Sequence, residues 1–131
     1  MADETKVPIA VEIRQKSKEA LEGSGDEIKQ RIVDQLVEDE KGRRVDVLSD
    51  AFSAREALAR DLSKLRNKPD QVLHPIGGGD VVKYHNDDTV KTVKSKQEKL
   101  DNLDAAIETA MTSSTGESYD KLTKATNKAK E

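Results

Sequence analysis

Aromatic side chains are almost absent from this chain, and this shortage limits the kind of core that it can build. The 131 residues include only three aromatic ones, Phe52, Tyr84 and Tyr119, and neither Trp nor Cys occurs. Leu, Ile, Val and Phe together account for 28 residues, or about 21%, which is close to the level below which highly charged chains stay disordered. The sequence therefore favours an elongated helical protein with narrow apolar seams, or a protein that oligomerises or docks on a partner.

Charged side chains dominate the rest of the composition. The 23 basic and 26 acidic residues make up 37% of the chain and leave a net charge of −3. All seven arginines lie between Arg14 and Arg66, whereas residues 67–131 contain ten lysines and no arginine. Arginine suits bidentate pairing and interfaces, so one hypothesis places an interface in the first half. The alternative is that the charges simply solvate helix surfaces.

Several classes of protein are excluded by composition. A chain without cysteine has no disulfide framework, no thiolate metal site and no cysteine nucleophile. No apolar run approaches the roughly 18 residues of a membrane span, and the start, MADETK, is unlike a signal peptide. We therefore expect one soluble domain over residues 1–131, located in the cytoplasm, with no membrane partner.

Two helices are predicted in the first third of the chain, over residues 8–22 and 24–40. Val7, Ile9, Val11 and Ile13 also alternate in the manner of a strand, so helix and strand both remain open for residues 7–14. Ser24 and Glu27 form an S-x-x-E capping box at the start of the second helix. Gly42 and the charges before it predict a turn after residue 40.

Two further helices, over residues 43–66 and 88–112, have apolar seams at heptad spacing. The first seam contains Leu48, Leu58 and Leu62, and the second contains Leu100, Leu103 and Ile107. Both seams are shorter than a firm coiled coil requires, so antiparallel packing within one chain is favoured. Arg55 occupies an apolar position of the first seam, so it either needs an acidic partner such as Asp104 or Glu108 or marks a docking edge.

A short final helix is predicted over residues 116–128. Ser114 and Glu117 repeat the S-x-x-E pattern at its start, and its end, residues 124–131, is predicted to fray. The predicted fold class is thus all-α: an elongated helical hairpin or small bundle of three to four helices.

Residues 67–87 are predicted to form a long loop, either functional or loosely ordered. Loops of more than about 12–15 residues are uncommon in compact domains. Val81 and Val82 favour a short β segment near residues 80–85. The residues of this candidate functional loop are polar, flexible or aromatic: His74, Gly77, Gly78, Gly79, Asp80, Tyr84 and His85.

Known catalytic and cofactor motifs do not fit this loop or the rest of the chain. The glycine run is not followed by the Lys-Ser or Lys-Thr pair of a phosphate-binding loop. The ten-residue gap between His74 and His85 matches no compact metal-ligand motif, and no serine lies in a G-x-S-x-G elbow. We therefore expect no cofactor and no bound metal, and a metal-dependent enzyme ranks third among the functional hypotheses.

The favoured function is a non-enzymatic protein-interaction module, such as an assembly factor, an adaptor or a small inhibitor, that acts through helix packing. The partner would be another protein or a second copy of the chain. The elongated, highly charged style resembles that of small accessory proteins of bacteriophages and bacteria, which would imply the host cytoplasm or the virion as location. The candidate interaction residues follow the seams and their flanking arginines: Arg44, Leu48, Phe52, Arg55, Leu58, Leu62, Arg66, Leu100, Leu103 and Ile107.

The alternative hypothesis is a protein that associates with nucleic acid. Arg44, Arg55 and Arg66 recur every eleven residues, which places them on one helix face. Acidic residues are interspersed among them, and stacking aromatics, which binders of single strands use, are nearly absent.

Overall fold

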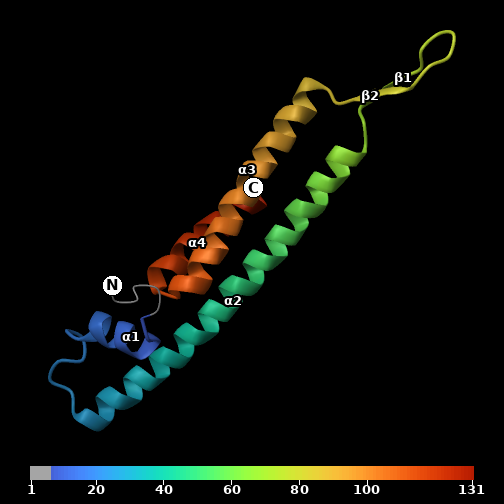
Figure 1. The fold of residues 1–131 in the computed structure, drawn as a ribbon. Helices are drawn as coiled ribbons and strands as arrows, with labels where there is room; N and C mark the ends of the chain where they lie inside the picture. Colours follow the sequence, from blue (N-terminus) through green and yellow to red (C-terminus); the bar gives the residue numbers. More distant parts are fainter. Residues whose placement is uncertain (1–6) are drawn as a thin grey trace.

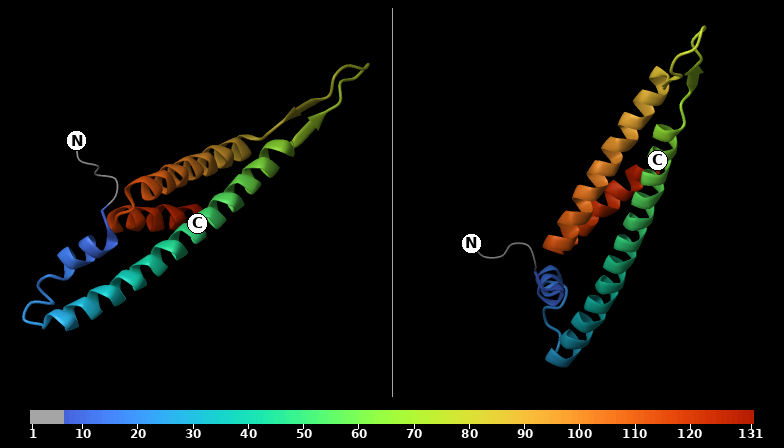
Figure 2. Two further views of the ribbon diagram at one scale, coloured as in Figure 1. Left: turned by 60° about the horizontal axis from the view of Figure 1, so that its bottom comes forward. Right: turned by 45° about the vertical axis from the view of Figure 1, so that its right-hand side comes forward.

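An elongated bundle of helices ends in a small two-stranded sheet in the computed structural model, which describes residues 7–131 (Figure 1). The helices of this region are α1 (Ile9–Ser17), α2 (Asp26–Asn67), α3 (Asp87–Ser113) and α4 (Gly116–Lys130). Helices α2 and α3 form an antiparallel hairpin, and α4 folds back to pack on both (Figure 2). The predicted all-α hairpin with a short β segment is therefore confirmed. Within residues 7–131, no helix combines the length and apolarity needed to cross a membrane.

Helix α2 is longer than the sequence suggests, because the predicted turn at residues 38–42 does not form. The two helices predicted over 24–40 and 43–66 are one helix of 42 residues. The Glu40 side chain accepts hydrogen bonds from Arg43 and Arg44, one turn further along, and these bonds span Gly42. A helical glycine costs only about 1 kcal/mol relative to alanine, so these bonds and the surrounding helix formers keep the helix continuous.

The first helix and the first cap also differ from the predictions. Residues 7–14 belong mainly to a helix rather than a strand, but α1 ends at Ser17 instead of residue 22. Gly23 adopts a left-handed φ of 87° within the connection to α2. The N-cap of α2 is Gly25, so the capping box predicted for Ser24 and Glu27 is wrong.

The junction between α3 and α4 shifts the second predicted capping box by one residue. Ser114 ends α3 in the left-handed region with a φ of 53°, and its N–H donates to the carbonyl of Ala110. It therefore cannot also start the next helix. Thr115 does so: its side chain accepts from the Ser118 N–H, and the Ser118 hydroxyl accepts from the Thr115 N–H.

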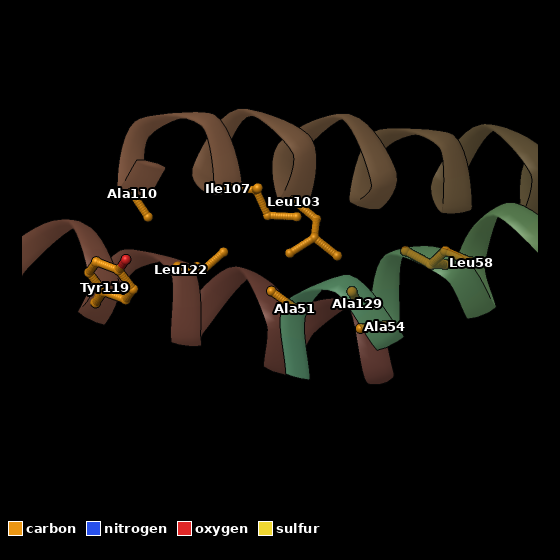
Figure 3. Packing of buried hydrophobic residues seen from close by; sticks show 9 residues of the cluster. All are labelled: Ala51, Ala54, Leu58, Leu103, Ile107, Ala110, Tyr119, Leu122 and Ala129. Carbon is orange, nitrogen blue, oxygen red and sulfur yellow. The ribbon is translucent and has the colours of Figure 1, made fainter. Parts of the chain in front are cut away.

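The core is a narrow seam between α2, α3 and α4. Leu103, Ile107 and Ala110 of α3 point toward the other two helices (Figure 3). Half of the facing residues are alanines, which lets the three helices approach closely: Ala51, Ala54 and Leu58 of α2, with Tyr119, Leu122 and Ala129 of α4. The seam predicted from the sequence is thus confirmed, with alanines in place of aromatic bulk.

Helix α4 is ordered to its end, contrary to the fraying predicted for residues 124–131. Thr126 and Ala129 are buried, and Lys130 Nζ lies 2.6 Å from Asp50 Oδ1 of α2. These contacts tie the last turn to the hairpin. Helix α4 covers the part of the hairpin that lies away from the sheet, and the part nearer the sheet consists of α2 and α3 alone (Figures 1 and 2).

Candidate interaction site

Arg44 lies inside the molecule, where it joins all four helices. Its side chain is 5% exposed, and its Nη2 and Nε atoms each donate a 2.8 Å hydrogen bond, to Glu12 of α1 and to Glu40 of α2. Its Nη1 atom donates to the carbonyl of Ser114, and its guanidinium lies 5.2 Å from the ring centre of Tyr119. The donors of Arg44 are therefore directed at partners within the chain, which makes it a structural residue in this fold.

Glu12 links α1 to the start of α4. Its Oε1 atom accepts a 2.6 Å hydrogen bond from the Gly116 N–H. A β-carbon at position 116 would lie 2.5 Å from that oxygen, so any larger residue would require the Glu12 carboxylate to shift. Burial opposes ionisation of Glu12, but hydrogen bonds from Arg44 and from Gly116 outweigh it and hold the pKa of Glu12 below its usual 4.5.

Glu40 makes the stability of this cluster dependent on pH. Hydrogen bonds from Arg43, and then from Arg44, lower the pKa of Glu40 from 4.5 to about 2 against the effect of burial. Because the folded pKa lies below the unfolded one, the resulting stabilisation is complete above pH 4.5 and is lost as the pH falls toward 2. At 1.36 kcal/mol per pKa unit, the loss is at most about 3 kcal/mol.

Urea denaturation at pH 7, 4 and 2.5 measures this loss for the wild type and for Glu40→Gln. We expect the wild type to lose more stability than the variant on acidification, since the variant lacks the ionisable group. Equal pH dependence in the two proteins would contradict the assignment to Glu40.

The other two arginines of the predicted basic face are paired across the hairpin. Arg55 Nε donates to Asp104, which confirms that this seam position needs an acidic partner. Arg66 Nη2 donates a 2.6 Å hydrogen bond to Gln97 of α3. With Arg44 buried, the three arginines do not form a continuous exposed row on α2.

The apolar candidates of the two seams are mainly used in folding. Leu58, Leu62, Leu103 and Ile107 are buried, whereas Leu48 and Leu100 pack partly buried against the core. Phe52 differs from these residues because it is 47% exposed on α2. Most of the predicted interaction residues thus hold the hairpin together.

An ordered β-hairpin, hereafter the arm (residues 71–84), occupies most of the segment predicted as a long loop. Strand β1 (Gln71–Leu73) pairs antiparallel with β2 (Val82–Tyr84), and the arm extends the long axis of the hairpin beyond α2 and α3 (Figure 1). Strand β2 confirms the extended segment expected near residues 80–85. Strand β1 was missed because three residues between a proline and a histidine give too short a pattern.

The connection between the strands depends on glycine. Gly77, Gly78 and Gly79 have φ values of 91°, 87° and 142°, which side chains disfavour. His74 and Asp80 lie in this connection and are exposed. Among residues 7–131, no group of three or more His, Asp or Glu side chains is arranged to hold a metal ion.

The arm exposes apolar side chains on both faces of its sheet. Leu73 lies opposite Val82 on the face that also carries Tyr84, and Val72 lies on the other face. Leu73 and Val82 are 51% and 50% exposed, and Ile76 in the connection is fully exposed. The arm carries only two charged residues, Asp80 and Lys83, among 14, whereas the remaining 117 residues carry 47. The arm is therefore a weakly charged, largely apolar projection on a highly charged protein.

A polar cluster fixes the base of the arm to the helices. Asp70 accepts a 2.9 Å hydrogen bond from the Asn86 N–H, and its own N–H donates to the carbonyl of Tyr84. The His85 Nε2 atom lies 3.3 Å from the carbonyl of Arg66, at the end of α2. Hydrogen bonds from the Thr89 side chain and the Asn86 backbone lower the pKa of Asp70. The cluster holds the arm in line with the hairpin.

Comparison with protein-family models, curated proteins and solved structures finds no significant match for this chain. The structure itself shows an elongated helical protein that presents an apolar β-hairpin at one end.

Proposed function

We propose that this protein is a non-enzymatic protein-binding module, an assembly factor, adaptor or small inhibitor, that docks on another protein through its arm. The observation that supports this proposal is the set of apolar side chains exposed on an arm that carries only two charged residues. Soluble proteins rarely leave such surface uncovered unless it serves a partner. In this proposal the helical hairpin of α2 and α3 serves as a support that holds the arm away from the rest of the molecule. We propose the cytoplasm, or a virion and its host, as the location.

The two apolar faces indicate the shape of the partner. A flat surface would cover Leu73 and Val82 and leave Val72 in water, whereas a cleft covers both faces of the sheet. Full burial of one Leu, Ile or Val side chain contributes about 1.5–3 kcal/mol. Three such side chains supply part of the binding free energy of a micromolar complex, which is about 8 kcal/mol. The open edges of the two strands can form further backbone hydrogen bonds with the partner. We therefore propose a protein partner whose surface has an apolar cleft next to an exposed edge strand of its own sheet.

Photo-crosslinking in a lysate of the native host tests this proposal. A photoreactive amino acid at position 76 should capture a discrete protein, and the same label at Asn127, on the exposed side of α4, should not. Introducing Leu73→Ser into the labelled chain should reduce capture at least tenfold, while the melting temperature stays unchanged because Leu73 supports no helix. Phe52→Ser is the matched control, since it removes an exposed apolar group outside the arm. Equal capture by the arm variant and the control variant would reject the proposal.

A second candidate function, binding of nucleic acid, is supported by a groove between α3 and α4. Lys99, Lys121, Lys124 and Lys128 line this groove of about 290 Å³. Polyphosphate backbones bind such lysines with an affinity that falls steeply as salt rises. Retention of the protein on a DNA or RNA column at 50 mM salt, lost at 300 mM salt and by Lys124→Glu, is the expected result. Absent or salt-independent retention would discard this candidate.

A further inference from the structure

A cavity lies between α1 and the first turns of α2, at the end of the molecule that is far from the arm. Its volume is about 620 Å³, within the range of 300–1,000 Å³ that is usual for small-molecule sites. The cavity is lined by the end of α1, by the connection that follows and by α2. Neither the seam core nor the arm includes any of these residues.

The floor of the cavity is apolar. Leu21 of the connection and Val33 of α2 line it, and they are only 9% and 4% exposed. Both side chains are fixed by packing between α1 and α2, so the cavity exists in the folded chain without a ligand. An aliphatic group placed there would be removed from water at little cost in reorganisation.

The rim of the cavity is cationic. Arg14 and Lys18, four residues apart on α1 and its C-cap, face the cavity together with Lys29 of α2. Asp26 is the acidic residue among the lining side chains. Within residues 7–131, no carboxylate lies within ion-pair distance of these three cations. The lining therefore carries three cations against one carboxylate, and an anion bound at the rim would be attracted to them.

We propose that this cavity binds an amphipathic anion, namely a carboxylate on an unbranched aliphatic chain, with the head at the cationic rim and the chain on the Leu21–Val33 floor. The other grooves with charged linings differ from this one. The groove between α2 and α4 is lined by Arg43 and four carboxylates, Glu38, Asp39, Asp46 and Asp50, which would repel an anion. The groove beside Ile13 and Leu36 contains Lys16 and Arg43, but Asp39 and Glu40 balance their charge. The lysine groove between α3 and α4 is smaller and lacks a floor of large apolar residues.

The absence of tryptophan from the chain provides a clean optical test. Gln15 lines the cavity, so Gln15→Trp places a single indole at the site, and Asn127→Trp places one on the exposed surface of α4, outside the cavity lining, as a control. Decanoate below its micelle concentration should change the emission of the Gln15→Trp protein saturably and leave the control unchanged. Decanol, which lacks the charge, and acetate, which lacks the chain, should each bind at least tenfold more weakly than decanoate.

Charge variants in the Gln15→Trp background locate the head group. Lys29→Gln should weaken decanoate binding about tenfold, and Lys124→Gln, which removes the same charge from the lysine groove, should have no effect. Circular dichroism confirms that the helices are retained. Equal binding of decanoate and decanol, or equal effects of the two lysine variants, would overturn the proposal.

A further experiment with lipid vesicles distinguishes a free fatty acid from a membrane as the source of the ligand. Phosphatidylcholine vesicles with and without phosphatidylglycerol are added to the same Gln15→Trp protein. We expect vesicles alone to leave its emission unchanged. A response to anionic vesicles combined with no response to decanoate would replace the cavity by a membrane-binding surface. Because the cavity lies far from the arm, these results are independent of the photo-crosslinking outcome.

Discussion

Replacement of Arg44 by alanine should lower the free energy of unfolding by about 3–5 kcal/mol, the usual cost of removing one partner from a buried ion pair. The variant leaves Glu12 and Glu40 without their shared guanidinium and leaves the carbonyl of Ser114 without its side-chain donor. Small domains have only about 5–15 kcal/mol of stability in total. Urea denaturation followed by circular dichroism measures the difference.

Arg55→Ala is the matched control for Arg44→Ala. Arg55 also pairs with a carboxylate on another helix, but its side chain is 47% exposed. Exposed ion pairs contribute about 0–1 kcal/mol, so the control should lose less than about 1 kcal/mol. If the two variants lose similar amounts, Arg44 is not the structural centre described above.

Leu103→Ala should cost about 2–5 kcal/mol, the range observed when a fully buried leucine is truncated and leaves a cavity. Leu103 has no exposed surface and lies between α2 and α4 in the narrow seam (Figure 3). The alanines that surround it cannot move into the space, since they are fixed to their helix backbones. Thermal and urea denaturation provide the measurement.

Leu100→Ala serves as the comparison, one turn earlier on the same helix. Leu100 is partly buried and packs at the margin of the core, so its truncation should cost clearly less than that of Leu103. Equal losses would show that the core extends further toward the sheet than the buried cluster indicates.

The hairpin and its seam were predictable because they depend on periodicity. Leu58, Leu62, Leu103 and Ile107 repeat at helical spacing, and the pairing of Arg55 with Asp104 follows from placing a charge in an apolar stripe. Such patterns are local, so a single sequence reveals them.

The continuity of α2 and the role of Arg44 were not predictable in the same way. Gly42 carries a helix-breaking signal, and the Glu40 bonds that span it become visible only in the structure. The partners that bury Arg44, Glu12 and Ser114, are distant along the chain. Nothing in the local sequence distinguishes Arg44 from the half-buried Arg43 beside it. The arm was missed in part because its three-residue strands depend on pairing across a glycine turn rather than on their own pattern.

The partial coverage of the hairpin by α4 has a mechanical consequence. The 23 residues that follow Arg44 to the end of α2 correspond to about 35 Å of helix at 1.5 Å per residue, and the arm lies beyond them. A rotation of only 5° where the three helices meet would displace the end of α2 by about 3 Å over that length. A small change in angle near Arg44 is thus magnified at the arm.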